Sequence, residues 1–493
     1  MIVVTGGAGF IGSNIVADLD RRGHDIVVVD DLADERKRAN LAGIDVVEMV
    51  DKDEFLARLT DRGALEGVSA VIHQGACSST TESDVDYVMR TNYEYSMVLA
   101  DACLRAAVPL IYASSAAVYG NSTDQRDEAG NEHPLNVYGR SKALFDQHVR
   151  DDLAGTATQI VGLRYFNVYG PHEDHKDEMA SLVLQLDDQL EATGEARIFG
   201  AAGGFGPGEQ RRDFVSVDDI VSVVRWFLDR PDRSGIFNCG TGTSRTFAEL
   251  AGEVIRCRGA GTVRHVPFPD ALIGRYQFDT RADLTRLRAA GCDHEFAPIE
   301  VGVERYLAWR HRVAATHVIL DRDGVLNREP ASGWVTDAAQ WEWETGALDA
   351  LDLLAASGVR VSIVTNQSCI GRGLVAADVV ERLHSWLAAE LRARGVDLVG
   401  IFVCPHAPDA GCACRKPGAA LFEQAIAESG VSAARTVAVG DDVRDVEAAR
   451  AAGVRPIVVL TGKGRATLDA VPDVERHHGL RAAIAQSTWE RFR

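Results

Sequence analysis

The 493-residue sequence lacks several features that would place it in a specialised class of protein. It contains no apolar run long enough to span a bilayer, so we expect no transmembrane helix. A glycine-rich turn begins at residue 6, too early for a signal peptide, and we expect none. Positive charge is in deficit, since 52 Lys and Arg face 72 Asp and Glu and the net charge is −20. This balance argues against non-specific binding to nucleic acid or to an anionic membrane.

Internal repeats and low-complexity segments are also lacking, and the nine cysteines are not spaced as a disulfide framework. Three of the cysteines crowd between Cys404 and Cys414 beside a histidine, which is the spacing of a metal site. Free thiols of this kind indicate a reducing compartment, so we expect a cytoplasmic protein. The length allows about three domains, and two large ones are plausible at 46% hydrophobic content.

Short apolar runs alternate with helical periodicity in the first part of the chain, which predicts a doubly wound parallel sheet of the Rossmann type. The expected strands are residues 2–4, 26–29, 70–73, 110–113 and 160–163. After residue 170 the pattern loosens into loops rich in Gly and Pro. We therefore expect a mainly cofactor-binding part over about residues 1–170 and a smaller substrate lobe over residues 171–312.

A second α/β alternation begins after a short linker near residues 311–316, which contains neither Pro nor Gly. Its expected strands are residues 317–320, 359–365, 398–403, 436–439 and 456–460. The sequence therefore predicts two α/β domains, residues 1–312 and residues 316–493.

The turn after the first expected strand contains Gly6, Gly9 and Gly12 in the spacing G-x-x-G-x-x-G. Glycine lets the backbone approach a pyrophosphate closely, and the following helix, expected to open near Gly12, supplies free N–H groups. The second expected strand ends in Asp30 and Asp31, and an acid at this place can hydrogen-bond a ribose. Together these features predict a dinucleotide site, with an ordinary glycine-rich turn as the alternative.

Tyr138 and Lys142 are spaced Y-x-x-x-K, which places both on one face of a helix, one turn apart. A neighbouring ammonium stabilises a phenolate, so we expect Lys142 to lower the pKa of Tyr138 and make it a usable base. Ser114 and Ser115 end the fourth expected strand, where ligands of parallel sheets bind, and Ser114 is the candidate catalytic serine. The alternative for the Tyr–Lys pair is a solvated helix face.

In the second domain, Asp321 and Asp323 of the motif DRDGVLN follow an apolar strand and point to the same side of an extended segment. We expect Asp321 to attack phosphorus and Asp323 to protonate the leaving alkoxide and then activate water. Asp441 of GDDVRD follows another strand, and with the two aspartates of DRDG it forms the candidate Mg²⁺ site. A lone D-x-D is often only a turn, so the prediction depends on all the motifs together.

Thr365 follows a strand in VTNQS, and Arg415 and Lys416 offer positive charge to a phosphate. Directly before them, three thiolates and one imidazole in the spacing C-x-H-x₅-C-x-C complete a tetrahedral zinc shell, formed by Cys404, His406, Cys412 and Cys414. With no open position, this zinc is expected to be structural and to pin the loop that presents Arg415 and Lys416. The alternative is a set of free thiols.

The motifs of the first domain resemble the extended short-chain dehydrogenase/reductase family. Further stretches, over about residues 1–310, are similar to the ADP-L-glycero-D-manno-heptose 6-epimerases: HQGACSSTTE, YASSAAVYG, PLNVYGRSK, LRYFNVYGP, DHKDEMAS, RRDFV and PFPDALIGRYQ. The resemblance implies a redox epimerisation, in which a nicotinamide takes a hydride from carbon 6 of a heptose and returns it to the opposite face. Two faces need two proton-transfer groups, which the family places at Tyr138 and Lys176.

The same resemblance implies contacts with the cofactor and with a nucleotide sugar. The implied cofactor contacts, besides those already named, are Phe10, Ile11, Gln74, Gly75, Ala76, Cys77, Ser78, Asn92 and Lys142. The implied substrate contacts are Asn167, Arg212 and Tyr276, of which the arginine suits a pyrophosphate. The family also suggests a homo-oligomer formed through this domain.

The choice between NADP and NAD stays open, with NADP favoured. The family uses mainly NADP, with lysines matching Lys37 and Lys52, and the basic run at residues 36–38 suits a 2′-phosphate. Asp30 favours a free ribose hydroxyl and therefore NAD. Asp31 stands where family members commonly carry an uncharged residue, and a second carboxylate would repel phosphate.

Nucleotide-sugar dehydratases and 4-epimerases are the related alternatives for the first domain. Dehydratases carry an Asp-Glu pair where this chain has Ala116 and Ala117, so elimination of water would lack its acid and base. A 4-epimerase is not excluded by the chemistry, and the heptose-specific motifs decide against it.

The second domain resembles the haloacid dehalogenase-like phosphatases, and among them the D-glycero-D-manno-heptose 1,7-bisphosphate 7-phosphatases, over about residues 316–493. DRDGVLN, TNQSCIGRG, CPH…CACRKPG and GDDVRD carry this resemblance. It implies that Thr365 and Lys416 steady the phosphoryl group and that Arg415 selects the substrate. The TNQS motif adds Asn366, Gln367 and Ser368 as substrate contacts. Asp442 is a departure, because some relatives have a basic residue there.

Histidinol-phosphate phosphatases share this scaffold and zinc loop and remain an alternative for the second domain. A different alternative is that one domain is a non-catalytic sensor of sugar or phosphate. The favoured hypothesis is a bifunctional enzyme of ADP-heptose synthesis that takes a nucleotide sugar in one domain and a sugar bisphosphate, as the β-anomer, in the other.

Overall fold

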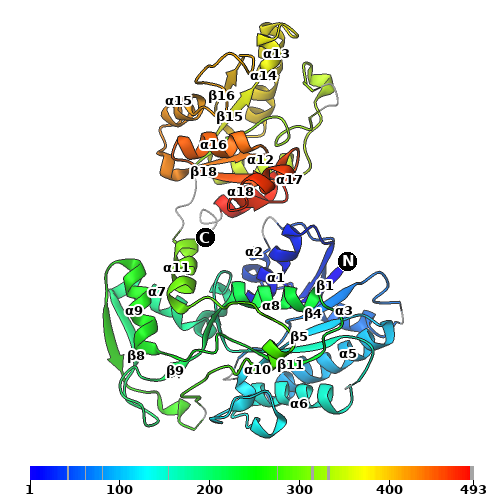
Figure 1. The fold of residues 1–493 in the computed structure, drawn as a ribbon, viewed down its shortest axis with the longest axis vertical. Coiled ribbons are helices and arrows are strands. Elements are labelled where there is room, and N and C mark those ends of the chain that lie inside the picture. The colour runs from blue at the N-terminus through cyan, green and yellow to red at the C-terminus, as the bar shows by residue number, and fades with distance from the viewer. Residues whose placement is uncertain are drawn as a thin grey trace. The chain divides into compact units, whose positions relative to one another are not determined.

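In the computed structural model the chain forms two compact units, each an α/β fold built on one parallel sheet (Figure 1). The first contains residues 1–41 and 46–311, and the second contains residues 312–493. The structure describes residues 1–41, 44–61, 63–79, 82–153, 155–274, 276–311, 316–329 and 333–488.

The sheet of the first unit has seven described strands, all parallel, in the order β11-β6-β5-β4-β1-β2-β3. Their bounds are β1 (Ile2–Thr5), β2 (Ile26–Asp30), β3 (Glu48–Asp51), β4 (Ala70–His73), β5 (Leu110–Ser115), β6 (Ile160–Tyr165) and β11 (Gly235–Cys239). Most of these strands are buried and β-branched, as expected for a parallel sheet covered on both faces. The five strands predicted for this sheet are confirmed, and β3 and β11 add to them.

Helices cover both faces of this sheet. On one face α1 (Phe10–Arg21) packs against α8 (Val217–Leu228). On the other face Val3, Val71 and Leu110 of the sheet join Leu99 and Phe145 in one apolar cluster. The helices of that second face are α3 (Lys52–Arg58), α5 (Tyr95–Ala106) and α6 (Val137–Asp151). Two short helices, α2 (Glu35–Ala39) and α4 (Val85–Val88), lie in the connections.

A smaller lobe follows β6, as the loosened sequence pattern predicts. It contains three two-stranded ladders, β7 (Asn167–Tyr169) with β10 (Phe214–Ser216), β9 (Arg211–Arg212) with β12 (Arg245–Thr246), and β8 (Glu195–Phe199) with β13 (Thr262–Val266). Its helices are α7 (Leu182–Thr193), α9 (Phe247–Arg258) and α11 (Ile299–Arg310), whereas α10 (Thr285–Ala289) packs against β11. Leu186, Leu250 and Val303 contribute to a core that is separate from the core under the large sheet.

The sheet of the second unit has six described strands, all parallel, in the order β16-β15-β14-β17-β18-β19. Their bounds are β14 (His317–Leu320), β15 (Arg360–Asn366), β16 (Asp397–Cys404), β17 (Thr436–Gly440), β18 (Arg455–Val459) and β19 (Glu475–His477). The five predicted strands are confirmed and β19 is added.

Alternate residues of β14 enter opposite layers of the second unit, as the two-residue period of a strand requires. Val318 and Leu320 pack with α12 (Ala347–Ser357), α14 (Ala377–Ala393) and α18 (Leu480–Thr488). Ile319 packs with α15 (Ala420–Ser429) and α16 (Val443–Ala451) on the opposite face. Two further helices are α13 (Ser368–Gly371) and α17 (Gly464–Ala470).

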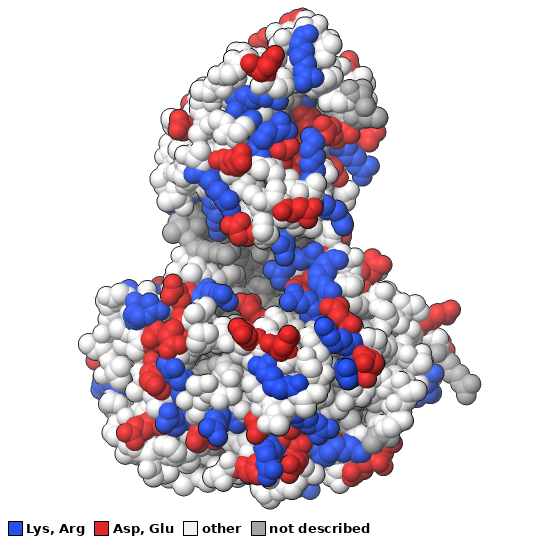
Figure 2. Space-filling model, in the orientation of Figure 1, with Lys and Arg blue, Asp and Glu red and all other residues white. Residues whose placement is uncertain are grey.

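Acidic and basic side chains are interspersed over the face of each unit that Figure 2 presents. The excess of acid is therefore not gathered into one acidic patch on this face. Within the described residues, no helix combines the length and the apolarity that crossing a bilayer requires.

Strand order places a crevice at one edge of each sheet. β1 lies between β2 and β4, and β14 lies between β15 and β17, so the chain winds in opposite directions on the two sides of each central strand. The loops that follow two such neighbouring strands diverge, and ligands of α/β sheets bind in the gap between them.

Candidate active sites

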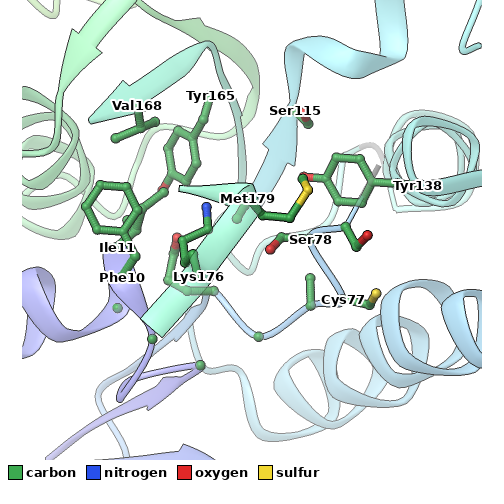
Figure 3. Close-up of a pocket in the computed structure, with 18 of the residues that line it drawn as sticks. Phe10, Ile11, Cys77, Ser78, Ser115, Tyr138, Tyr165, Val168, Lys176 and Met179 are labelled. Atoms are coloured by element: carbon green, nitrogen blue, oxygen red, sulfur yellow. The ribbon is translucent and has the colours of Figure 1, made fainter. Parts of the chain in front are cut away.

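The first unit contains a cavity of about 670 Å³ at the carboxyl ends of its strands (Figure 3). This volume lies within the range of small-molecule sites. Most of the predicted site residues line it: Gly6, Gly9, Phe10, Ile11, Gly12, Asp30, Asp31, Lys37, Lys52, Gln74, Gly75, Ala76, Cys77, Ser78, Ser114, Tyr138, Lys142, Asn167 and Lys176.

The turn after β1 is packed too closely for side chains at two of its glycines. A Cβ on Gly12 would lie 2.0 Å from the carbonyl oxygen of Gly6. Gly6 has φ +65°, and a Cβ there would lie 2.5 Å from the amide nitrogen of Gly75. Helix α1 begins at Phe10, slightly before the expected position near Gly12, so its first turn lines the cavity. This bare, close-packed turn is a cradle that fits the pyrophosphate of a dinucleotide.

Asp30, at the end of the neighbouring strand β2, stabilises this turn through hydrogen bonds. Its Oδ2 accepts hydrogen bonds from the backbone N–H groups of Ala8 at 2.9 Å and Gly9 at 3.1 Å. Its Oδ1 accepts one from Lys37 Nζ at 3.1 Å. The residue predicted to bind a ribose therefore also holds the glycine turn in place.

Lys52 Nζ donates to Asp31 Oδ2 at 2.8 Å, and this bond lowers the pKa of Asp31 below its ordinary value. Both lysines that the resemblance assigns to the cofactor are thus paired with carboxylates. Arg36, in the basic run, pairs with Asp177 through bonds of 2.9 and 3.2 Å. Because Asp177 directly follows Lys176, this ion pair joins α2 to the segment that carries the predicted second base.

Tyr138 and Lys142 lie one turn apart on α6 and both line the cavity, as their spacing predicts. The net shift of the Tyr138 pKa is opposite to the predicted lowering, because enclosure in the cavity raises this pKa above its ordinary value. Lys142 Nζ instead donates to the carbonyl oxygen of Ala113 at 2.8 Å. Burial lowers the pKa of Lys142 to about 8.

Ser115, rather than Ser114, is the serine that contacts Tyr138. The Ser115 side chain opposes the rise in the pKa of Tyr138. Ser114 is buried, and its hydroxyl donates to Asp146 Oδ2 at 2.8 Å. Asp146 also accepts from Arg164 Nε at 2.8 Å, so Ser114 belongs to a buried network behind the strand end. Both serines line the cavity, and the sequence could not tell which of them lies next to Tyr138.

Lys176 lies on the 3₁₀ segment Asp174–Met179, and its Nζ is 5.4 Å from the centre of the Phe10 ring. Burial lowers the pKa of Lys176, and the nearby carboxylate of Glu173 opposes that shift. Figure 3 shows Tyr138 and Lys176 pointing into the cavity from different elements, with Met179 between them in this view. Two groups able to move protons therefore share one cavity.

The segment that carries Lys176 is tied to the helix that begins the cofactor cradle. Ser13 Oγ lies 3.0 Å from His172 Nδ1, and Asn14 Nδ2 donates to the carbonyl oxygen of Pro171 at 2.9 Å. Buried Glu173 accepts hydrogen bonds from the backbone N–H and the hydroxyl of Ser181 at 2.5 and 2.7 Å. These contacts give Lys176 a defined position, which the sequence alone did not indicate.

Three predicted residues are not among the described residues that line this cavity. Asn92 is buried, and its side chain holds both backbone groups of Cys77, at 2.8 and 3.0 Å. Arg212 and Tyr276 lie in the smaller lobe, with the Arg212 guanidinium 4.6 Å from the Tyr276 ring centre. Burial lowers the pKa of Arg212. The predicted cofactor contact at Asn92 is therefore replaced by a supporting role.

The second unit contains a cavity of about 250 Å³ at the carboxyl ends of β14, β15 and β17. The predicted residues that line it are Asp321, Asp323, Thr365, Asn366, Ser368, Arg415, Lys416 and Asp441. Four motifs that are distant in sequence therefore meet at one edge of the sheet.

Asp321, Asp441 and Asp445 each offer a carboxylate oxygen, and these oxygens lie within 4.8 Å of one another. Lys416 Nζ pairs with Asp321 at 2.8 Å and with Asp445 at 2.6 Å. Burial and the neighbouring carboxylates raise the pKa of Asp321 to about 8 and that of Asp441 to about 7. Lys416 pairs with two of the three carboxylates, and the oxygens of all three suit a hard divalent cation.

This cluster adds Asp445 to the predicted metal ligands. The Asp323 side chain lies outside the cluster and accepts hydrogen bonds from Asn327 Nδ2 at 3.1 Å, Gln367 Nε2 at 2.9 Å and Arg322 Nη2 at 2.9 Å. The signal for Asp445 was present in the sequence, since GDDVRD places a further acid one helical turn after Asp441.

Three residues of the TNQS motif line the second cavity, and the fourth, Gln367, supports it from the interior. Asn366 clamps the backbone of Lys416, accepting from its N–H at 3.1 Å and donating to its carbonyl at 3.2 Å. Gln367 is fully buried and donates to both Asp323 and Thr365, so its predicted substrate contact is replaced by a positioning role. Ser368 and Thr365 line the cavity.

Asp442, the departure noted in the sequence, caps helix α16 and is paired with Arg444. Arg444 donates to both of its carboxylate oxygens, at 2.9 and 2.6 Å, which lowers the pKa of Asp442 to about 2. The acid is thus locally neutralised, and Arg444 lines the cavity beside it.

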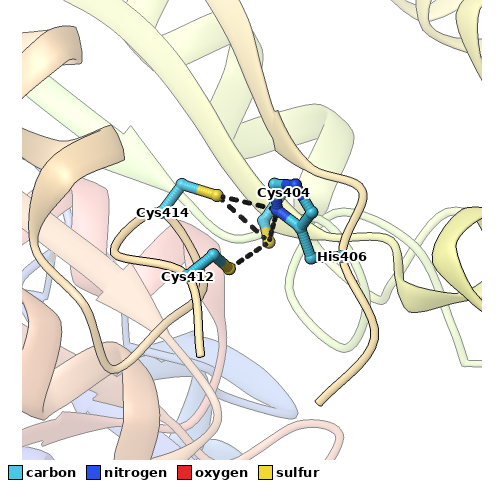
Figure 4. Close-up of side chains that lie close together, drawn as sticks. All are labelled: Cys404, His406, Cys412 and Cys414. Atoms are coloured by element: carbon cyan, nitrogen blue, oxygen red, sulfur yellow. Dashed lines mark hydrogen bonds between the residues drawn. The ribbon is translucent and has the colours of Figure 1, made fainter. Parts of the chain in front are cut away.

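Cys404, His406, Cys412 and Cys414 converge at the end of β16 (Figure 4). Contacts between their Sγ and Nδ1 atoms range from 3.2 to 3.7 Å. Tetrahedral ligands 2.0–2.3 Å from a zinc ion are about 3.3–3.8 Å apart. The predicted ligand set therefore fits a zinc ion with no position left open.

Residues 2–240 match the NAD dependent epimerase/dehydratase family, and residues 413–481 match the HAD-hydrolase-like family. The ADP-L-glycero-D-manno-heptose-6-epimerase of Alkalilimnicola ehrlichii is 52% identical over 308 residues, which are 62% of this chain and 96% of that protein.

Two solved structures share the fold of the first unit. The ADP-L-glycero-D-manno-heptose-6-epimerase of Helicobacter pylori has a TM-score of 0.55 at 30% identity, covering 63% of this chain and 96% of that one. The UDP-glucose 4-epimerase of Thermus thermophilus in complex with NAD has a TM-score of 0.53 at 27% identity, covering 63% and 99%.

The fold and the first cavity define an NAD(P)-binding member of the epimerase/dehydratase class, joined in this chain to a HAD-like hydrolase domain. The chain belongs to the family of the ADP-L-glycero-D-manno-heptose-6-epimerases.

The glycine cradle yields a direct prediction. We expect Gly12→Ala to abolish binding of NADPH and NADH, because the added methyl group would collide with the backbone of Gly6. Fluorescence titration of the full chain measures this. Gly252→Ala is the matched control, since it also lies in a helix but nothing approaches within 4 Å of its added Cβ. Unchanged affinity in Gly12→Ala would contradict the assignment of the cavity.

Proposed function

We propose that the first unit epimerises carbon 6 of ADP-D-glycero-D-manno-heptose to give ADP-L-glycero-D-manno-heptose. The observation that carries this proposal is the shared cavity of Tyr138 and Lys176 beside the glycine cradle. The 52% identity to an epimerase of that name supports the choice of substrate.

A nicotinamide cofactor, when bound, supplies hydride chemistry, accepting a hydride from carbon 6 and returning it to the other face. The residues of the chain manage the proton on the attached oxygen. As the carbinol becomes a carbonyl, one of Tyr138 and Lys176 removes the proton of the hydroxyl. After the carbonyl group rotates to present its opposite face, the other of these two residues donates a proton to the same oxygen. Ser115 lines the same cavity as Tyr138 and favours its ionised form.

We propose NADP as the preferred cofactor, with Lys37 and Lys52 on its 2′-phosphate. Both lysines line the cavity with Asp30 and Asp31, which are their present partners. A 2′-phosphate would have to share these cations with the carboxylates. NAD is the alternative, since Asp30 is the acid expected at a ribose.

For the second unit we propose hydrolysis of the 7-phosphate of D-glycero-β-D-manno-heptose 1,7-bisphosphate. The support is the meeting of Asp321, Asp323, Thr365 and Lys416 in one cavity. Asp321 forms a bond to phosphorus as the bond to the sugar oxygen breaks, and Asp323 gives that oxygen a proton. Water then attacks phosphorus, its proton passes to Asp323, and Asp321 is released with inorganic phosphate.

Two metals fit this unit. Asp321, Asp441 and Asp445 would hold Mg²⁺, which neutralises phosphate charge when bound. The cluster of three cysteines and His406 would hold a structural zinc ion next to Arg415 and Lys416. A histidinol-phosphate phosphatase is the second candidate function, favoured by the same zinc loop; the heptose epimerase on the same chain supports the sugar bisphosphate.

Loss of either proton-transfer group should abolish epimerisation. We expect Tyr138→Phe and Lys176→Met to lower kcat at least about 100-fold, since each removes an acid or base. NMR of the ADP-heptose product measures the rate. Tyr169→Phe is the control, because Tyr169 is buried outside the cavity. Full activity in Tyr138→Phe, or no epimerisation by the wild type, would contradict the proposal.

Removing the nucleophile should stop phosphate release. We expect Asp321→Asn to lower turnover of heptose 1,7-bisphosphate about 1,000-fold or more, because the amide cannot attack phosphorus. Phosphate release with Mg²⁺ measures this, with exposed Asp473→Asn as the control. Good wild-type turnover of histidinol phosphate with none of the bisphosphate would favour the alternative function.

Loss of the zinc shell should affect only one activity. We expect the wild type to carry about one zinc ion per chain and Cys412→Ser to lose it, with phosphatase turnover lowered and epimerisation unchanged. Metal analysis by mass spectrometry and the two assays measure this on the same preparation. Cys257→Ser, a partly buried cysteine of the first unit, is the control. Zinc-free protein with full phosphatase turnover would overturn the structural role.

A further inference from the structure

We propose that His384 and Arg322 are positioning residues that aim Asp323 at the leaving oxygen of the phosphate ester. The inference rests on the proposed phosphatase function and extends it to two side chains that no sequence motif assigned. Neither is among the described residues that line the cavity, so both act through Asp323 rather than on substrate.

Arg322 stands between the two aspartates of DRDG, but its side chain is fully buried within the unit. Its guanidinium donates to Asp323 Oδ1 twice, from Nη2 at 2.9 Å and from Nε at 3.2 Å. A buried guanidinium must be paired, and Asp323 is its partner carboxylate. The contact therefore joins the interior of the unit to a side chain that is 21% exposed at the cavity.

His384 lies on α14, a helix distant in sequence from DRDG. It contacts Nη1, the guanidinium nitrogen of Arg322 that does not bond to Asp323. Its Nε2 lies 2.8 Å from Arg322 Nη1. Arginine only donates hydrogen bonds, so Nε2 is the acceptor and Nδ1 carries the ring proton. Burial and the adjacent guanidinium lower the pKa of His384 to about 4, which keeps the ring neutral and able to accept at neutral pH.

The consequence is a fixed orientation for the proton-transfer group. Oδ1 of Asp323 is held by Arg322 and by Asn327, and Oδ2 is held by Gln367. Proton transfer to a leaving oxygen requires the donor within hydrogen-bond reach, so a carboxylate free to rotate would transfer less efficiently. Without His384 the guanidinium loses one of its anchors, and with it the orientation of Asp323.

The two roles that His384 could have make different predictions for different leaving groups. A sugar alkoxide needs a proton to leave, whereas p-nitrophenolate leaves without one. A positioning role therefore affects kcat/KM for the alkyl ester and spares the aryl ester. A merely structural role lowers both together, because both need the same folded site.

The experiment measures kcat/KM of the full chain with Mg²⁺ on heptose 1,7-bisphosphate and on p-nitrophenyl phosphate. We expect His384→Leu to lower the first about 10- to 100-fold and to change the second less than about threefold. His384→Gln, whose amide oxygen can accept from Arg322, should restore most of the loss. His317→Leu is the control, a buried histidine bonded to Ser362 and Thr436 away from Asp323, and should not separate the two esters.

An equal fall in the kcat/KM of His384→Leu on both esters, or no fall on either ester, would overturn the positioning role. Failure of the proposed function has a different signature. A wild type that hydrolyses neither ester would overturn the phosphatase activity and the inference with it. A wild type that prefers histidinol phosphate would change the substrate only, since that alkyl phosphate then replaces the bisphosphate in the same comparison.

Discussion

The carboxyl ends of parallel strands all lie at the same edge of a sheet, and both cavities of this protein depend on that constraint. In the first unit it brings together the glycine turn after β1, the acids at the end of β2 and the serine at the end of β5. In the second unit it joins DRDG, TNQS and GDDVRD, which are separated by long stretches of sequence. The remaining elements cover the sheets and hold these strand ends in register.

At both edges a buried layer supports the residues that face the cavity. Asp30 holds the glycine turn through two backbone bonds, and Ser114 engages Asp146 while Ser115 meets Tyr138. In the second unit the buried Arg322 donates hydrogen bonds to Asp323. Burial makes these supports effective, because an unpaired polar group there would lose its interaction with water without replacement. Lys416, which reaches the second cavity, pairs with the carboxylates of Asp321 and Asp445.

The sequence predicted both sheets because buried parallel strands are apolar and β-branched. It missed β3, whose residues EMVD are half-exposed, and β19, whose residues ERH are polar. It also missed β11, although the residues GIFNC of that strand are largely buried. Motifs located the sites, but not the direction of each side chain. The different contacts of Ser114 and Ser115, the place of Asp445 in the carboxylate cluster and the raised pKa of Tyr138 all depend on three-dimensional neighbours. Spacing along the sequence does not specify these neighbours.

The redox nature of the epimerisation is tested most directly by running the reaction in D₂O and measuring deuterium on carbon 6 of the product by NMR. If the hydride passes to the cofactor and returns within the closed site, carbon 6 keeps its original hydrogen and gains no deuterium from solvent. Incorporation of deuterium at carbon 6 with each turnover would mean that a proton leaves the carbon instead. That result would contradict the role assigned to the cofactor cavity and to the two proton-transfer groups that share it.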